Sequence, residues 1–598
     1  MSLQNTNPNE TPDDSKDPAP ASNHQNPNKN EFLTEDSILD QETAHVLEVM
    51  HDTPDVTPFK LKNMIVESVQ FTLNVINRDR GKSAKVRVPN SLRPSQIAMC
   101  ILDREPVLCI QCGGVNTNSE QDLLGIYASS GEKAGTYITD EKYLRNIIRE
   151  YNNNINAQDV KDVIQRIKDK AKRVRRTEDP DLCPVNNGII NYKTKELMPF
   201  DPKYVFLAKS KVNYNPNAVM PVYQNPDGST WDPESWMREL SDDPAIVNLL
   251  WQVCGAIIRP FNNWGKAIWM YSNQGNNGKG TLCALFRNLS GEGTYASLTL
   301  DAFGQDFQLE PLLNSTSIIT DENDVGGYID RAANLKAVIT NDVIQINRKH
   351  KVPVSFQFKG IMVQCINDYP RIRDTSDSFY RRQIFIPFEK CFTGREKKYI
   401  KDDYLKRTEV LEYVLWRVVN MPDYTEFDEP AACKLALAEY KEYNNPVEQF
   451  LGEILEVAQW DVLPFKFLYD IYKSWYTDTM PSGKPQGRNN FIKDVQAIIQ
   501  AGHFPEWVHV NQPIHPGHRM DAPEPLIIQY NVKDWANNGY DKTDPLNYCR
   551  TPLKTSYKGI VRFGSITDGE QRNGIVTNDT TNMYTSGAND DVGTTNKS

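Results

Sequence analysis

The stretch of sequence that decides the fold reads Asn273-Gln274-Gly275-Asn276-Asn277-Gly278-Lys279-Gly280-Thr281. An apolar run, Ala267–Tyr271, precedes it, and an amphipathic run, Thr281–Arg287, follows it. A strand, a glycine-rich turn and a helix together make the layout of a phosphate-binding loop. In such a loop, small residues let backbone N–H groups surround a polyphosphate at the positive end of the helix dipole. The flanking strand and helix favour this interpretation over a surface turn that contains Gly-Lys by chance.

Two positions of this loop depart from the usual pattern. In such loops the lysine, here Lys279, reaches the β- and γ-phosphates, and a hydroxyl holds a magnesium ion. Asn273 stands where the first glycine is usual, and Gly280 stands where Ser or Thr is usual. Thr281 is the nearest hydroxyl and the candidate magnesium ligand, although Gly280 leaves that assignment open. We expect ATP and Mg²⁺ as cofactors, with the nucleotide bound by Asn273, Gly275, Asn277, Gly278, Lys279, Gly280 and Thr281.

A pair of carboxylates follows the next apolar strand, Ser317–Thr320. In phosphate-loop ATPases the two carboxylates of such a pair have different roles. Asp321 would hold magnesium, and Glu322 would orient and deprotonate the attacking water. An isolated Asp-Glu is usually an ordinary strand end. Its place about forty residues after Lys279, behind its own apolar strand, favours the catalytic interpretation.

Two further polar features follow apolar runs. Asn367 comes after the strand Gly360–Ile366, where its side chain would contact the γ-phosphate or the attacking water; the alternative is a turn-forming Asn before Pro370. Arg381 and Arg382 precede the apolar run Ile384–Phe388. One of them would act as an arginine finger in a neighbouring subunit's site, and the alternative is a surface salt bridge.

A basic block lies between the carboxylates and Asn367. It comprises Arg348, Lys349, His350 and Lys351, and β-branched residues flank it on both sides. This pattern predicts a hairpin with a charged tip. A ring of such tips in a central channel would track a phosphate backbone, whereas a solvated turn is the simpler alternative.

The ordered motifs resemble the superfamily 3 helicases, in the phage, plasmid and poxvirus primase-helicase branch. The resemblance covers residues from about 185 to 395 and rests on Asn277-Gly278-Lys279, Asp321-Glu322, the block Lys336–Lys351, Asn367 and Arg381-Arg382. It implies an α/β fold with an AAA+ type ATPase core, a hexameric ring, Mg²⁺–ATP hydrolysis and 3′-to-5′ movement on single-stranded DNA. It also implies that the nucleotide lies between subunits, with Arg381 or Arg382 acting in trans.

The chain divides by composition and periodicity into seven segments. The predicted segments are a disordered tail (1–35), a small mixed α/β domain (36–180), a helical connecting domain (181–265), the ATPase core (266–395), a helical connection (396–445), a winged-helix-like domain (446–550) and a second disordered tail (565–598). In the mixed domain we expect strands at Glu67–Val75 and Pro106–Ile110 and helices at Glu141–Tyr151 and Asp159–Val174. The motif Ser241-Asp242-Asp243-Pro244 predicts the start of another helix.

The predicted winged-helix-like domain resembles those that follow the motor in the same family. An amphipathic helix at Phe467–Tyr476 and a second helix from Arg488 are expected, with extended segments near Val508 and Ile527-Ile528 as a wing. The second helix would present Arg488 and Lys493 to DNA. A plain packing domain is the alternative.

Composition limits the class of protein. The 598 residues are 39% hydrophobic and 24% charged, with a net charge of −11, and contain no apolar run of about 18 residues, so no transmembrane helix is expected. The N-terminus lacks a basic and apolar signal sequence, and we expect a cytoplasmic protein. Only Cys109 and Cys112 form a Cys-x-x-Cys pair, which favours buried thiols over a zinc site. Acidic net charge does not exclude DNA, because the positions of the basic residues decide binding.

The leading hypothesis is an ATP-driven replicative DNA helicase of a phage, plasmid or mobile element. The expected partners are single-stranded and forked DNA, an origin duplex, further copies of the chain in a homo-hexamer, and a separate primase. The alternative is an origin-binding initiator that uses ATP for assembly and local melting without processive unwinding. A primase-helicase would need a polymerase acid cluster, which the sequence does not show, and a small-molecule kinase would leave the hairpin block unexplained.

Overall fold

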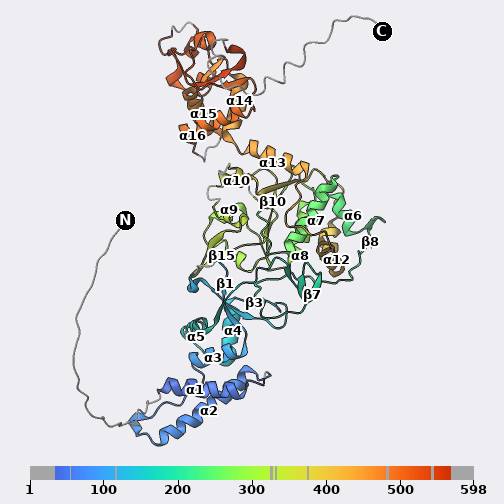
Figure 1. Ribbon diagram of the computed structural model, residues 1–598, viewed down its shortest axis with the longest axis vertical. Helices are drawn as coiled ribbons and strands as arrows, with labels where there is room; N and C mark the ends of the chain where they lie inside the picture. Colours follow the sequence, from blue (N-terminus) through green and yellow to red (C-terminus); the bar gives the residue numbers. More distant parts are fainter. Residues whose placement is uncertain are drawn as a thin grey trace, which may run out of the picture. The chain divides into compact units, whose positions relative to one another are not determined.

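The computed structural model describes residues 34–53, 55–114, 118–323, 328–329, 333–372, 376–479, 484–540 and 544–566 (Figure 1). Almost all of both predicted disordered tails therefore lies outside the described residues. The chain divides into two compact units. One contains residues 1–105 and 144–170, and the other contains residues 106–143 and 171–598. The boundary divides the predicted domain 36–180 between the two units.

The first unit is helical. Its helices are α1 (Glu35–Val49), α2 (Pro58–Arg78), α3 (Pro94–Arg104), most of α4 (Glu141–Tyr151) and α5 (Ala157–Lys170). The predicted strand at Glu67–Val75 is wrong, because this segment lies inside α2. Thr57 caps that helix, and its buried residues recur every fourth position: Leu61, Ile65, Val69 and Leu73. A four-residue spacing puts apolar side chains on one face of a helix, whereas a strand would put alternate residues there.

The second unit begins with a four-stranded sheet in the order β3-β2-β1-β4. Its strands are β1 (Val107–Gln111), β2 (Leu123–Tyr127), β3 (Tyr137–Ile138) and β4 (Lys172–Arg175). The helix predicted over Asp159–Val174 therefore ends earlier, at Lys170, and the basic residues after it form a strand parallel to β1. Cys109 and Cys112 are buried in or beside β1.

Residues 181–265 are mixed rather than purely helical. They contain a sheet of β5 (Leu182–Val185), β6 (Gly188–Asn191) and β7 (Glu196–Met198), a second sheet of β8 (Tyr223–Gln224) and β9 (Thr230–Trp231), and the helices α6 (Pro233–Glu239) and α7 (Pro244–Ile258). The predicted helix start is confirmed. Asp243 caps α7 by accepting a hydrogen bond from Ala245 N at 2.8 Å, and Pro244 takes the first helical position.

A five-stranded parallel sheet forms the centre of the second unit. Its order is β11-β12-β16-β10-β18, with bounds β11 (Tyr295–Ala296), β12 (Ser317–Thr320), β16 (Ile361–Ile366), β10 (Ala267–Tyr271) and β18 (Gln383–Pro387). Ile268 and Met270 face one hydrophobic cluster, while Ala267 and Trp269 face another. Burial on both faces explains why these strands read as continuous apolar runs.

Helices and smaller strands complete the central region. The helices are α8 (Lys279–Ser290), α9 (Ala333–Ile339), α10 (Asp377–Tyr380), α11 (Lys398–Asp402), α12 (Thr408–Val419) and α13 (Ala431–Tyr443). The predicted hairpin is confirmed as β14 (Val343–Arg348) and β15 (Lys351–Gln357), and β13 (Tyr328–Ile329) pairs with β17 (Arg371–Ile372).

The C-terminal region has its own hydrophobic core. Its elements follow in the order α14 (Pro446–Val457), β19 (Val462–Pro464), α15 (Phe465–Thr479), α16 (Arg488–Gln500), β20 (Trp507–His509), α17 (Leu526–Gln529) and β21 (Gly559–Arg562). The segment Ile527-Ile528, predicted as extended, is helical instead. The third strand of the sheet is β21, which lies beyond residue 550 and pairs with both β19 and β20. Among the described residues, no helix is long and apolar enough to cross a membrane.

Candidate nucleotide site

The predicted phosphate-binding loop lies between β10 and α8. Two of its residues, Asn276 (φ 53°) and Gly278 (φ 88°), have left-handed backbone conformations. A Cβ on Gly278 would approach Leu240 Cδ2 to 2.7 Å, so glycine is needed there for space as well as for conformation. The next residue, Lys279, opens α8. The loop therefore closes tightly onto a helix N-terminus.

Lys279 is buried beneath this loop. Its Nζ donates to the carbonyl oxygens of Ser272 (3.3 Å) and Ile366 (3.0 Å) and to Oδ1 of Asn367 (3.0 Å). Burial lowers the pKa of the Lys279 ammonium, and no carboxylate of the described residues pairs with it. The structure thus brings together two residues that the sequence predicted separately, and it leaves a desolvated cation ready for an anion.

The parallel sheet places the other predicted groups at the same edge. The strands β10, β16 and β12 are neighbours and run in the same direction. Their carboxyl ends carry the phosphate loop, Asn367 and Asp321 respectively. Ligands of open α/β sheets bind at this edge.

Asp321 has one engaged and one unpartnered oxygen. Arg287 Nη1 donates to Oδ2 at 2.9 Å, whereas Oδ1 is buried with no hydrogen-bond partner. A Cβ added to Gly280 would lie 3.7 Å from this Oδ1, so Gly280 occupies the position whose side chain would face the carboxylate. The backbone at Gly280 would therefore direct the usual Ser or Thr hydroxyl toward Asp321, but glycine supplies no hydroxyl. The assignment of Thr281 as a magnesium ligand stays a prediction.

Glu322 follows Asp321 and is exposed, without a hydrogen bond or ion pair in the part of the chain that the structure describes. The next residue, Asn323, was missed by sequence reasoning. Its Nδ2 donates to Gln364 Oε1 and to the Cys365 carbonyl oxygen, both at 2.9 Å, and its Oδ1 accepts from Leu300 N. Asn323 thereby attaches the carboxylate turn to β16.

The segment after β18 also reaches the loop, and this was not predicted. Phe392 N donates to the Asn276 carbonyl oxygen at 2.7 Å, and Asn276 Nδ2 donates to Glu396 Oε1 at 3.1 Å. Lys401 Nζ lies 3.7 Å from the position that a Gly280 Cβ would take. The Lys401 ammonium therefore lies beside the place that a side chain at position 280 would occupy, and this place faces Asp321.

The tandem arginines lie near the amino ends of the parallel strands, opposite the carboxyl ends that carry the phosphate loop. Gln383, the first residue of β18, pairs with Ala267 at the amino end of β10. Arg382 Nη1 donates to both Ser378 O and Ser378 Oγ at 2.8 Å. The guanidinium of Arg381 is exposed and has no such partner within the described residues.

The four basic residues of the hairpin tip differ in their contacts: two have partners within the chain, and two are exposed. Arg348 folds back, and its Nη2 donates to the Val352 carbonyl oxygen at 2.9 Å; burial lowers its pKa. Lys351 pairs with Glu141 Oε1 at 3.2 Å. Lys349 and His350 are exposed, and His350 makes the turn with a φ of 60°. Only these two project freely.

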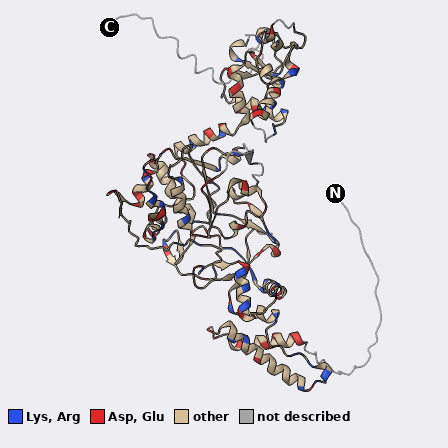
Figure 2. Cartoon of the chain, turned by 180° about the vertical axis from the view of Figure 1, so that it is seen from behind, with Lys and Arg blue, Asp and Glu red and all other residues tan. Residues whose placement is uncertain are grey.

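In the C-terminal region, α16 begins at Arg488 as predicted, and both Arg488 and Lys493 are exposed on it. Apart from the basic run that includes β4, basic and acidic residues are mostly interspersed along the chain (Figure 2). The role of Arg488 and Lys493 in DNA binding stays a prediction.

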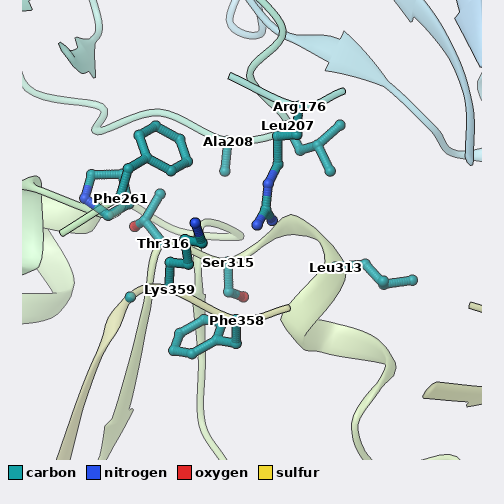
Figure 3. Close-up of a pocket in the computed structure, with 11 residues that line it drawn as sticks. Arg176, Leu207, Ala208, Phe261, Leu313, Ser315, Thr316, Phe358 and Lys359 are labelled. Carbon is teal, nitrogen blue, oxygen red and sulfur yellow. The ribbon is translucent and has the colours of Figure 1, made fainter. Parts of the chain in front are cut away.

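A cavity of about 20 Å³ lies elsewhere, between Arg176, Phe261, Phe358 and Lys359 (Figure 3). Its volume suits about one water molecule. Arg176 (3.0 Å) and Lys359 (2.6 Å) both pair with the single carboxylate of Glu178, so both cations already have an internal partner. This cavity is not a nucleotide site.

Three family models match the chain. Residues 117–241 match a family described as D5 N terminal like, residues 442–535 match a Poxvirus D5 protein-like family, and residues 270–382 match a family of unknown function, DUF5906. No curated protein sequence matches the chain.

The solved structures that are similar to this chain include two at low sequence identity. The apo structure of the NrS-1 C-terminal region (A form) is 13% identical, covers 78% of this chain and 100% of its own, and has a TM-score of 0.38. A JCV helicase bound to a small molecule is 17% identical, covers 37% of this chain and 64% of its own, and has a TM-score of 0.23. These TM-scores are too low to establish a shared arrangement.

Along the sequence, the two D5-type matches flank the segment that carries Lys279, Asp321 and Asn367, and they support a replication-helicase-like function. These matches support the resemblance to the superfamily 3 helicases, because both families are named for a D5 protein of the primase-helicase type. The resemblance predicted from the ordered motifs is confirmed.

Proposed function

We propose that this chain is an ATP-dependent replicative DNA helicase of a phage, plasmid or mobile element, which works as a ring and moves 3′-to-5′ on single-stranded DNA. One observation carries the proposal. At one edge of the parallel sheet, the buried Lys279 ammonium is bonded to Asn367, and Asp321 holds a buried oxygen without a partner. This arrangement suits a nucleoside triphosphate with a divalent cation.

The residues present fit Mg²⁺ and ATP. The backbone N–H groups of the loop and Lys279 would hold the phosphates, and Asp321 Oδ1 would satisfy its missing interaction by binding the cation, directly or through water. Bound magnesium would neutralise the charge that develops on the phosphates. Glu322 stands beside Asp321 and would accept the proton of the attacking water. Because Gly280 supplies no hydroxyl, the cation would depend more heavily on Asp321.

The position of the arginines supports a ring. A five-residue strand spans about 16 Å at roughly 3.3 Å per residue, so Arg381 lies too far along the sheet to reach the phosphates of its own chain. A neighbouring subunit can present its arginine across an interface, as arginine fingers do. Arg381 is the better candidate, because Arg382 is already bonded to Ser378.

The topology supports the finer fold assignment. The strand of the phosphate loop, the Asn367 strand and the Asp321 strand are adjacent, as an AAA+ type core requires for the three groups to meet. In the C-terminal region, the helices α14, α15 and α16 and three strands in the sheet order β19-β21-β20 support a winged-helix-like domain, whose second and third helices would be α15 and α16.

The test is unwinding of forked DNA that carries either a 3′ or a 5′ single-stranded tail, with and without ATP. We expect ATP-dependent unwinding that requires the 3′ tail. Unwinding that requires only the 5′ tail would contradict the proposed direction. The matched control is Lys279→Ala, which should neither hydrolyse ATP nor unwind either fork.

The second candidate is an origin-binding initiator, favoured by the exposed Arg488 and Lys493 on α16. Such a protein would hydrolyse ATP and melt a short duplex, but it would not displace a long strand. Hydrolysis without unwinding of either fork would favour it. The next measurement would then be duplex binding by the full chain and by Arg488→Ala with Lys493→Ala.

A further inference from the structure

Two buried thiols lie directly beneath the phosphate loop. Cys283 is on α8, one turn after Lys279, and Cys365 is on β16, two residues before Asn367. Their Sγ atoms are 3.3 Å apart, and the two residues are 0% and 2% exposed. They belong to elements that are far apart in the sequence, so only the fold brings them together.

Asp321 completes a three-residue cluster with these thiols. One ligand atom from each of Cys283, Asp321 and Cys365 lies within 4.8 Å of the others. Asp321 Oδ1 is buried without a hydrogen-bond partner, although Arg287 occupies the other oxygen. The unpartnered oxygen is an independent sign that a ligand is missing, because buried carboxylate oxygens are normally satisfied.

The donor set has a definite chemical preference. Two sulfurs and one oxygen suit a tetrahedral zinc-class ion with Zn–S bonds of about 2.3 Å, which would separate the sulfurs by roughly 3.8 Å. The observed separation requires only a small outward shift. The Asp321 side chain is 28% exposed, so the ion has a route of entry and water has access to the fourth position. Thiolate ligands select such ions over magnesium.

We propose that Cys283, Cys365 and Asp321 form a site for a thiophilic divalent cation of the zinc class, and that its occupation withdraws Asp321 from magnesium and stops ATP hydrolysis. As the ion enters, two new metal–sulfur bonds form and the two thiol protons leave to solvent, so the net charge of the cluster is unchanged. Binding depends only on the donor geometry. The loss of hydrolysis rests on the proposed function, so the two parts are tested separately.

The binding test uses Co²⁺ with the full-length, reduced and nucleotide-free protein. A cobalt ion bound to thiolates gives a sulfur-to-cobalt charge-transfer absorption band, which does not depend on any enzymatic activity. We expect the band to saturate at one ion per chain and to disappear on addition of Zn²⁺, which binds such sites more tightly than Co²⁺.

Matched variants identify the ligands. Cys283→Ala and Cys365→Ala lie on different elements, and each should weaken the ion's binding by at least about 100-fold, since even outer-shell partners of a metal are worth about 10–100-fold. Cys112→Ala, in the Cys-x-x-Cys pair, is the control and should leave the band unchanged. Thermal melting without metal checks that each variant is folded. No band, or a band lost in Cys112→Ala but kept in both other variants, would overturn the site.

The functional test is the ratio of ATPase rates with and without Zn²⁺, at a fixed excess of Mg²⁺–ATP. We expect Zn²⁺ to inhibit the wild-type protein at least tenfold, and a chelator to reverse this inhibition; tenfold corresponds to about 1.4 kcal/mol. In a Cys283→Ala or Cys365→Ala variant that retains hydrolysis, the ATPase rate should be the same with and without Zn²⁺. Saturated cobalt binding with undiminished hydrolysis would keep the site but overturn its inhibitory role. A protein that binds cobalt but never hydrolyses ATP would contradict the proposed function instead.

Discussion

Lys279 carries its positive charge into a position that water hardly reaches. Burial lowers its pKa, so the folded protein holds this proton less tightly than the unfolded chain does. The ammonium therefore costs folding free energy at neutral pH, and this cost fades as the pH rises through the folded-state pKa toward the usual value of 10.5. Bound polyphosphate would offset the same cost at neutral pH.

We expect Lys279→Met to lose nucleotide binding while remaining folded. Its stability without nucleotide should stay within about 1 kcal/mol of the wild type, because removal of the buried charge offsets the lost hydrogen bonds. Mg²⁺–ATP at 100 times its Kd should stabilise the wild-type protein by about 2.7 kcal/mol and the variant not at all. Thermal unfolding with and without nucleotide measures both effects. A variant that ATP still stabilises would remove Lys279 from the site.

Two neighbouring glycines should respond in opposite ways to the same change. Gly280→Ser adds a hydroxyl where the nearest atoms, Asp321 Oδ1 and Lys401 Nζ, are 3.7 Å from the new Cβ, so the side chain fits. We expect half-maximal ATPase activity at a severalfold lower Mg²⁺ concentration. Gly278→Ser, the matched control, meets Leu240 at 2.7 Å with a φ of 88° and should lose nucleotide binding. An unchanged Mg²⁺ requirement in Gly280→Ser would show that this position does not face the ion.

At the scale of elements, the hairpin of β14 and β15 is the part that the structure redefines most. The sequence predicted four basic residues at its tip, but Arg348 and Lys351 are held by Val352 and Glu141. The exposed pair Lys349 and His350 remains. Contacts with single-stranded DNA by this element should therefore depend on two residues of the four.

We expect Lys349→Ala with His350→Ala to reduce unwinding by about tenfold or more while ATP hydrolysis without DNA is kept, since the tip would lose both of its free contacts with the phosphate backbone. Lys351→Ala is the control and should have a smaller effect, because Glu141 already holds that side chain. The measurement is the ratio of strands displaced to ATP hydrolysed. If Lys351→Ala has the larger effect, the tip contacts DNA through a different arrangement.

At the scale of the whole molecule, one chain has its nucleotide groups at one edge of the sheet and Arg381 at the other. If a neighbouring subunit supplies the arginine, ATP hydrolysis requires the assembled oligomer and not a single chain. Arg381→Ala alone should lower ATP hydrolysis by about 1000-fold, the range of arginine fingers that act in trans. Arg382→Ala should retain more activity, because its partner is Ser378 of its own chain.

Mixing the two kinds of defective subunit tests this arrangement. Arg381→Ala protein mixed with Lys279→Ala protein should regain part of the wild-type ATPase rate, since some interfaces then combine an intact loop with an intact arginine. Each variant alone is the control. No recovery in mixtures that demonstrably exchange subunits would contradict an arginine that acts across the interface.

Much of the core could be predicted because its signals are local. The strands β10, β12 and β16 read as apolar runs buried on both faces, and the polar residues that follow them mark the functional edge. The capped start of α7 was equally local, since Asp243 and Pro244 are adjacent. The errors at α2 and Ile527-Ile528 arose where short apolar patterns suit a strand or a helix alike.

What the sequence by itself determined about this protein is the order of its motifs, and with it the family and the identity of Lys279, Asp321, Glu322 and Asn367 as candidate site residues. Only the tertiary structure decided which of these meet. The bond from Lys279 to Asn367, the vacancy at Gly280 between Asp321 and Lys401, and the thiol pair all join residues at least 40 positions apart in chain order. The physical reason is that such contacts depend on strand order and helix packing, which no local pattern of residues encodes.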